Sequence, residues 1–473
     1  MEKVQFQIES TLPELKDLST KGLFTRTELG TITARRKKFE TSLIKRVPVK
    51  QDFLDYAQYE IGLEKLRRAR YKRLGLDKSA QPRSVSSYSI VRRVLYILRR
   101  ATDKFPYDLG VWMAYIDYAR SEGMTKVVLQ GLTTALQLHP RNAALYILLS
   151  QHYLDPTSPT SSTSPRRAHP NFAIENVSPA RKTLLLGLRL MPSDRDLWRE
   201  YIKLEIGWVE ALRRRWKVLG IDLAGGEGAE KMDEDVAAGL EGEDLGANAF
   251  GSDGEQARKS IIKGDLIITV LQSAFSNPVL EKSLTFHTDL LHLLRTYPTG
   301  LRPRLLDAVY THLEEEPSFT FNPVARKTLL ERTLYDTPYD PEKDTKHRSP
   351  ETADDPVVLH GQELVQQLGE IVKQFRNPVP GAPEGWESTW NEQVGLWLLH
   401  WAQRMSSNED LQAYLLASIN PLIKPSAKPT ERLLRAHIEF LESLDEMSAV
   451  KPGPEKVQAL RAGLGRLYPE GSR

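Results

Sequence analysis

Apolar residues along most of this chain recur every three or four positions, which is the spacing of one face of an α-helix. Prolines, glycines and polar stretches separate these segments, as they do at the ends of helices. The strict alternation that marks a half-buried strand is nearly absent. The pattern predicts an all-α protein, with helices at about 1–20, 25–46, 51–75, 89–105, 125–138, 257–275, 278–296, 301–315, 389–405, 408–422, 429–445 and 454–467.

A proline followed six positions later by an aromatic residue occurs three times, each time where one expected helix ends and the next begins. The pairs are Pro106 with Trp112, Pro140 with Tyr146, and Pro192 with Trp198. A small residue stands five positions before each proline, and a leucine eight positions before. A period of about 34 residues with this pattern is typical of stacked helical hairpins, so we predict an α-solenoid of helix–turn–helix repeats.

Each aromatic residue opens a pattern in the helix that follows it. Trp198, Tyr201 and Glu205 stand at offsets of zero, three and seven, which places them on one helix face. The same offsets, complete or in part, are seen at Phe53, Tyr56 and Glu60, at Trp112 and Tyr115, and at Tyr146. A carboxylate on a packing face needs a partner, so we expect a neighbouring helix to supply an Arg, a Lys or a Tyr hydroxyl.

The composition divides the chain into segments. A basic helical segment at 1–50 precedes a repeat array at 51–221, which is interrupted by a low-complexity insertion at 155–170. An acidic, glycine-rich linker follows at 222–256, and then a second helical-repeat region at 257–473 with loops at 336–356 and 377–388. Within the insertion, Ser158 and Ser164 precede prolines. They are either sites of proline-directed phosphorylation or ordinary loop residues.

Charge is unevenly distributed, although the net charge is only +3. Residues 1–104 contain 24 Lys and Arg against 12 Asp and Glu, whereas the linker contains 11 acids and one lysine. Such a basic region is either a solvated helix face or a surface that binds a polyanion. The candidates for contacts with RNA or a partner protein are Arg35, Arg36, Lys37, Lys38, Lys45, Arg46, Arg67, Arg68, Arg70, Lys72 and Arg73.

No enzymatic motif is found in the sequence. It has no cysteine, which excludes disulfides and thiolate chemistry and is typical of a reducing compartment. The ten histidines are scattered, and the glycine-rich stretch at 225–228 lacks the Lys of a phosphate-binding loop. We predict a non-enzymatic protein with no catalytic residue, metal, cofactor or small-molecule substrate. With no run of about 18 apolar residues and no apolar signal core, we expect no membrane association.

The repeat resembles the HAT (half-a-tetratricopeptide) repeat, whose first helix carries Trp-x2-Tyr-x3-Glu. The N-terminal region narrows this resemblance. It is similar to the U3 small nucleolar RNA-associated protein 6 family at residues 22–28 (GLFTRTE), 34–40 (ARRKKFE), 53–61 (FLDYAQYEI) and 90–105 (IVRRVLYILRRATDKF). The resemblance is specific over about residues 1–215 and weaker beyond the linker.

This resemblance implies a scaffold of the nucleolar small-subunit processome, within its UTP-B subcomplex. The implied partners are WD40-propeller and other UTP-B subunits, U3 small nucleolar RNA and the 5′ external transcribed spacer of the pre-rRNA. The implied location is the nucleolus, within the nucleus. Two alternatives stay open: a HAT-repeat scaffold of mRNA splicing or 3′-end processing, and a tetratricopeptide-like adaptor that binds peptides.

Overall fold

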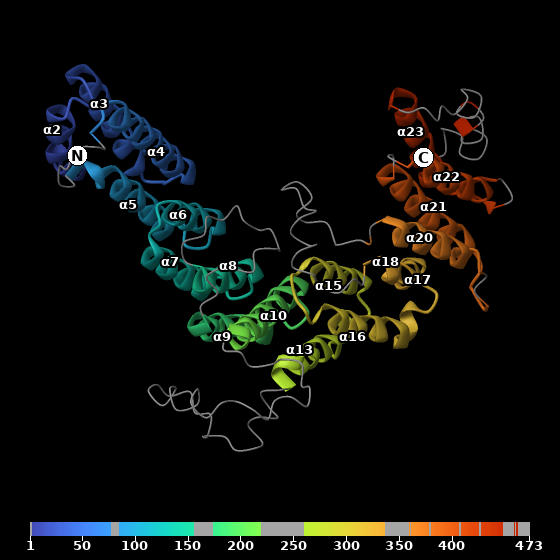
Figure 1. Ribbon diagram of the computed structural model, residues 1–473. Helices are drawn as coiled ribbons and strands as arrows, with labels where there is room; N and C mark the ends of the chain where they lie inside the picture. Colours follow the sequence, from blue (N-terminus) through green and yellow to red (C-terminus); the bar gives the residue numbers. More distant parts are fainter. Residues whose placement is uncertain are drawn as a thin grey trace, which may run out of the picture. The chain divides into compact units, whose positions relative to one another are not determined.

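The computed structural model of the chain is all-α, as predicted, and no strand occurs among the residues that it describes (Figure 1). These residues are 2–76, 85–155, 174–218, 260–335, 359, 361–377, 380–405, 408–424, 427–447, 458, 460 and 461. The expected insertion, the acidic linker, most of the loop at 336–356 and the helix at 454–467 lie largely outside them, as do Ser158 and Ser164. The chain forms two compact units, which divide within one helix after Tyr201.

The N-terminal unit begins with two short helices rather than the single helix expected at 1–20. They are α1 (Glu2–Glu9) and α2 (Leu12–Thr20). Pro13 stands in the first turn of α2, where its missing N–H costs nothing, and so the chain starts a new helix there. The expected capping box is confirmed, since Thr25 and Glu28 each accept a backbone N–H at the start of α3 (Arg26–Leu43).

Seven further elements continue this unit, each next to the one before it in sequence. They are α4 (Lys50–Arg73), η1 (Val85–Ser87), α5 (Ser89–Lys104), α6 (Leu109–Ser121), α7 (Thr125–Leu138), α8 (Ala143–Leu154) and α9 (Ile174–Leu190), followed by the start of α10 (Arg195–Val218). From α4 to α9, each α-helix packs on the next (Figure 1). This succession of neighbouring helices is the architecture that the repeat predicts.

The proline-to-aromatic spacing has a direct structural cause. In all three copies the polar atom of the aromatic side chain donates a hydrogen bond to the proline carbonyl six residues earlier. The bonds run from Trp112 Nε1 to Pro106 O (2.8 Å), from Tyr146 Oη to Pro140 O (3.0 Å) and from Trp198 Nε1 to Pro192 O (2.7 Å). Each bond spans the turn between two helices and satisfies a carbonyl that the helix end leaves without an intrahelical partner.

A second feature of the same turns was missed in the sequence. An Asp or Asn stands two positions after each proline, and its side chain accepts a backbone N–H at the start of the next helix. The three residues are Asp108, Asn142 and Asp194. Side-chain caps of this kind contribute about 1 kcal/mol each. Proline, Asx cap and aromatic donor therefore form one recurring joint between helices.

Small residues before the proline permit the helices of each hairpin to pack closely. Ala101 and Ala135 are buried, at 1% and 0% exposed, and Gly187 is the corresponding residue in the third copy. A Cβ at Gly187 would lie 3.0 Å from Cγ of Tyr146. The leucines eight positions before the proline, Leu98, Leu132 and Leu184, are at most 2% exposed.

The aromatic side chains are buried to different extents. Trp112 and Tyr146 are 7% and 2% exposed, so they are core residues. Trp198, which we expected to be a packing residue, is only half-buried, and the fully buried residue at this joint is its neighbour Leu197. Trp198 is tilted against Tyr201, with 6.3 Å between the ring centroids, and contributes mainly through its hydrogen bond.

The C-terminal unit contains the rest of α10 and a second series of helices. These are α13 (Asp265–Phe275), α14 (Pro278–Glu281), α15 (Leu284–Thr296), α16 (Arg302–Glu315), η2 (Pro317–Phe319), α17 (Pro323–Leu330), α18 (Arg332–Tyr335), α20 (Gly361–Phe375), α21 (Trp386–Arg404), α22 (Glu409–Ile423) and α23 (Glu431–Met447). The single helix expected at 278–296 is divided at Lys282 and Ser283, and the loop expected at 377–388 ends where α21 begins.

Tryptophans of α21 form the core of the last four helices. Trp390, Trp397 and Trp401 are at most 5% exposed, which confirms the buried stripe expected from their spacing. Phe375 of α20 packs edge-on against Trp390 and Trp397, at centroid distances of 5.6 and 4.9 Å. Helices α20 to α23 are thus held by an aromatic core rather than by a further proline joint.

A hydroxyl-deletion variant tests the helix joint. We expect Tyr146→Phe to lower the free energy of unfolding by about 1 kcal/mol, because it removes only the hydrogen bond to Pro140 O. Urea unfolding of the full chain measures the change. Tyr107→Phe is the control, since Tyr107 is 79% exposed and its loss should change little. Equal stability of Tyr146→Phe and wild type would contradict the role given to this bond.

The buried His287 predicts a loss of stability in acid. Burial lowers the pKa of His287 from 6.5 to about 4, because charging it among Phe275 and Phe286 is unfavourable. Its contribution is complete above pH 6.5 and is lost as the pH falls toward 4, because there only the unfolded chain binds the proton. The loss should be on the order of 2–3 kcal/mol.

We therefore expect His287→Phe to flatten the dependence of unfolding free energy on pH between 4 and 6.5. The measurement is a series of urea titrations across this range. His292→Gln on the exposed side of the same helix is the control and should leave the slope unchanged. An unaltered slope in His287→Phe would show that another group controls acid unfolding.

Candidate functional site

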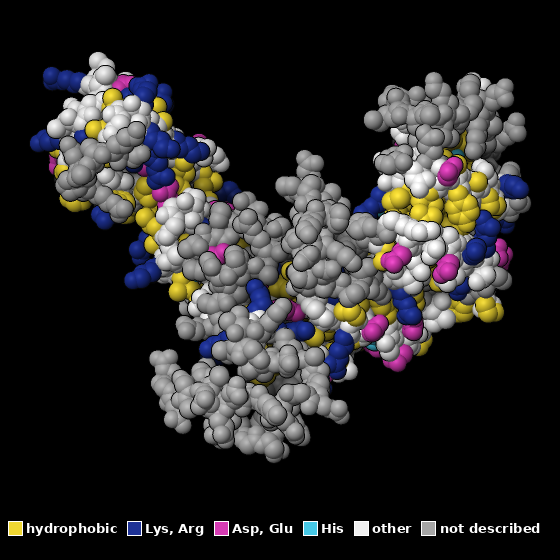
Figure 2. All heavy atoms as spheres, viewed as in Figure 1, with side chains coloured by type: hydrophobic (Ala, Val, Ile, Leu, Met, Phe, Trp, Pro, Cys, Tyr) yellow, Lys and Arg dark blue, Asp and Glu magenta, His cyan; other side chains and the backbone are white. Residues whose placement is uncertain are grey.

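The basic candidates lie on α3, α4 and the turn between them, and their side chains differ in exposure. Arg35, Lys37, Lys38, Lys45, Arg46, Arg68, Lys72 and Arg73 are exposed, Arg70 is half-buried, and Arg36 and Arg67 are buried. Lys and Arg side chains gather over these helices on the face shown in Figure 2. The basic run is therefore partly surface and partly core.

Arg36 is a correction to the predicted set, because it is 2% exposed and lies inside the protein. Its Nε and Nη2 donate to the two carboxylate oxygens of Glu60 at 2.7 and 2.8 Å, and Nη2 also reaches Glu14 at 3.1 Å. Arg93 of α5 contacts the other oxygen of Glu14. The partner expected for the carboxylate of Glu60 is thus confirmed, and it is a residue that we had placed on the surface.

Three further arginines are engaged in holding helices together. Arg67, at 6% exposed, makes two hydrogen bonds to Glu64, so it is also removed from the surface set. Arg68 bridges Glu64 and Glu122 at 2.7 and 2.5 Å, which ties α4 to the residue that follows α6. Arg70 is bound to Glu28, and its hydrogen bonds lower the pKa of the Glu28 carboxyl to about 2.

Five of the candidates combine exposure with the absence of an acidic partner among the described residues. They are Lys37, Lys38, Arg46, Lys72 and Arg73. Lys65, which lies in the same basic stretch but was not among the candidates, is exposed and unpaired in the same sense. Lys65 and Lys72 are two helical turns apart and share one face of α4. These lysines and arginines are the described charges best placed to meet a polyanion.

Aromatic residues pack beneath this surface. Phe53 and Tyr56 are 1% and 2% exposed, and Tyr56 stacks on Phe39 with centroids 5.0 Å apart. Burial, and then the charges of Glu60 and Glu40, raise the pKa of the Tyr56 phenol. For Arg36 burial lowers the pKa, but Glu60 and Glu14 reverse this and leave the pKa raised. Both groups therefore keep their protons throughout the physiological range.

The arrangement offers charge and shape rather than a reacting group. Among the residues that the structure describes, no cluster of three His, Asp or Glu side chains could hold a metal ion. Within the same residues, no helix is both long and apolar enough to cross a membrane. The one remaining member of the predicted repeat set, Glu205, is 1% exposed and belongs to the packing face of α10.

The buried ion pair predicts a large cost for removing one partner. We expect Glu60→Gln to lower the free energy of unfolding by about 3 kcal/mol, because the buried Arg36 charge loses its main counterion. Replacing both residues by Met should recover most of this loss, since no uncompensated charge then remains. Chemical denaturation measures both. Asp52→Asn, in the exposed pair with Lys45, is the control and should cost less than about 1 kcal/mol.

Residues 8–93 match the family model described as U3 small nucleolar RNA-associated protein 6. This range begins in α1, ends in α5 and contains the complete buried network of Glu14, Arg36, Glu60 and Arg93.

Curated relatives carry the same description. The chain is 36% identical over 219 residues to U3 small nucleolar RNA-associated protein 6 of Schizosaccharomyces pombe, covering 46% of this chain and 41% of that protein. It is 26% identical over 330 residues to the human homolog of that name, covering 69% of this chain and 47% of the relative. The chain thus spans less than half the length of these relatives. The predicted resemblance to the U3 small nucleolar RNA-associated protein 6 family is confirmed, with the family's own model matching the N-terminal helices.

Proposed function

We propose that this chain is a non-enzymatic scaffold subunit of the nucleolar particle that assembles on U3 small nucleolar RNA and processes the small-subunit pre-rRNA. The observation that carries the proposal is the match of residues 8–93 to the family model. The relatives are named for association with U3 RNA, and we extend that association to this chain. We place it in the UTP-B subcomplex, in the nucleolus, with WD40-propeller subunits as partners.

The structure supports a scaffold in two ways. Successive helices from α4 to α9 contact mainly their neighbours, so they present an extended surface instead of one enclosed site. The exposed charges on α3 and α4 offer an electrostatic contact for phosphates, which gives affinity without reading sequence. Both properties suit a protein that holds other components in place.

Purification of the tagged full chain from its native cell tests the identity of the particle. We expect U3 RNA and WD40-propeller proteins to co-purify, and the protein–protein part to survive ribonuclease treatment. Recovery of spliceosomal or 3′-end processing components instead would replace this proposal with the HAT-repeat alternative.

A charge-reversal variant tests direct contact with RNA. We expect Lys37→Glu with Lys38→Glu to weaken binding to U3 RNA and to reduce the slope of log affinity against log salt by about 1 for each phosphate that the protein no longer neutralises. Filter binding at several salt concentrations measures this. Lys126→Glu with Arg141→Glu, two exposed positions on α7 and beyond it, is the matched control. An equal decrease in affinity for both variants would indicate a nonspecific effect of net charge.

A further inference from the structure

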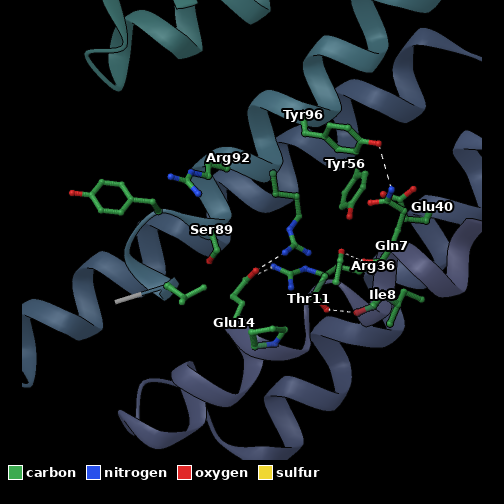
Figure 3. A pocket seen from close by; sticks show the side chains of 15 residues that line it. Gln7, Ile8, Thr11, Glu14, Arg36, Glu40, Tyr56, Ser89, Arg92 and Tyr96 are labelled. Atoms are coloured by element: carbon green, nitrogen blue, oxygen red, sulfur yellow. Dashed lines mark hydrogen bonds and ion pairs between the residues drawn. The ribbon is translucent and has the colours of Figure 1, made fainter. Parts of the chain in front are cut away.

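A cavity of about 540 Å³ lies between the first two helices and the start of α5. Its lining comes from α1, α2, α3, α4 and α5, so it exists only when all of these helices are assembled. Glu14 and Arg36 meet inside it, with Ser89 on the α5 side (Figure 3). The exposed candidates Lys37 and Lys38 do not line it. The cavity is thus distinct from the basic surface described above.

Three buried hydrogen-bond donors in this lining have no partner among the described residues. They are Arg36 Nη1, Arg93 Nε and Ser89 Oγ. Arg36 is the most informative, because only 2% of the residue is exposed and its other two nitrogens are fully engaged. A buried donor on a charged group that stays unbonded is unfavourable, so the lining is built to receive an acceptor.

The charges around the cavity determine how much negative charge it can accept. Three arginines are balanced by three carboxylates, in the pairs Arg36 with Glu60, Arg93 with Glu14, and Arg100 with Glu40. Arg92 also lines the cavity, is exposed, and has no acidic partner among the described residues. The balance leaves one positive charge, which matches a single monoanionic group.

The walls favour a polypeptide over a nucleic acid. Val85, Tyr88 and Tyr96 line the cavity and are 62%, 39% and 46% exposed, so they offer apolar contact beside the donors. RNA carries a negative charge on every nucleotide, and Glu14 and Glu40 in the lining repel all charges beyond the one that Arg92 balances. A carboxylate side chain next to apolar residues brings one charge and two acceptor oxygens.

We propose that this cavity is a docking site for an acidic side chain, Asp or Glu, of a partner protein segment that also carries apolar residues. The carboxylate accepts hydrogen bonds from Arg36 Nη1, Arg93 Nε and Ser89 Oγ, and the flanking apolar residues cover Val85 and Tyr96. The site is independent of the proposed U3 role, because it rests on the cavity and its donors alone.

Selection of a phage-displayed random dodecapeptide library on the full chain tests the proposal. We expect the enriched peptides to share an Asp or Glu beside Leu, Ile, Val or an aromatic residue. In fluorescence polarisation with a selected peptide, replacing its acid by the amide should weaken binding about tenfold, the usual effect of removing a charge-assisted hydrogen bond.

Variants of the chain assign the binding to the cavity. Arg92→Gln removes the surplus charge and Ser89→Leu fills the space beside Glu14, and both should weaken the peptide about tenfold or more. Arg99→Gln, at an exposed position of the same helix, is the matched control and should bind as wild type. Thermal melting of each variant confirms that it is folded.

Several outcomes would overturn the proposal. They are a failure to enrich any peptide, enriched peptides without an acidic residue, and unchanged binding to Arg92→Gln and Ser89→Leu. Displacement of the peptide by a single-stranded RNA dodecamer at lower concentration than by unlabelled peptide would assign the cavity to RNA. Because U3 RNA is absent from these assays, their failure leaves the proposed function standing, and the reverse also holds.

Discussion

The hydrogen bond from an aromatic side chain to a proline carbonyl sets the geometry of each helix joint. In an array where each unit contacts only its neighbours, an error in one turn displaces every unit that follows. Trp112, Tyr146 and Trp198 make the same bond at three successive joints, although their rings differ in size and burial. The common requirement of the joint is therefore a donor at the right height on the helix, and the apolar ring adds packing where the neighbours leave room.

The basic N-terminal region illustrates how one sequence run serves two purposes. Arg35, Arg36, Lys37 and Lys38 are consecutive, yet a helix turns each by about 100° from the last, so one of the four points inward. Arg36 is the inward residue, and it joins α2, α3 and α4 through Glu14 and Glu60. Its buried charge is tolerated because two carboxylates surround it, and the fold of the first four helices follows from satisfying that charge.

This buried network also accounts for the cavity beside it. Guanidinium groups have more donors than the adjacent carboxylates have well-placed acceptors, and so Arg36 Nη1 and Arg93 Nε face an open space. A structural ion pair and a recognition site thus share the same residues. The exposed lysines of α3 and α4 are separate from it and provide a contact of lower selectivity.

Periodic and local features were predictable from the sequence, because they depend on residues within one or two helical turns. The all-α class, the helix joints, the capping box at Thr25 and the tryptophan stripe of α21 are of this kind. The break at Pro13, the division at Lys282 and the half-exposed ring of Trp198 were not predicted, since each depends on the neighbour available to that side chain. The tertiary structure alone decided which arginine is buried, which carboxylate it meets, and that donors from α3 and α5 converge on one cavity. Those outcomes join residues 24 to 79 positions apart, and only the packing of whole helices brings such residues together.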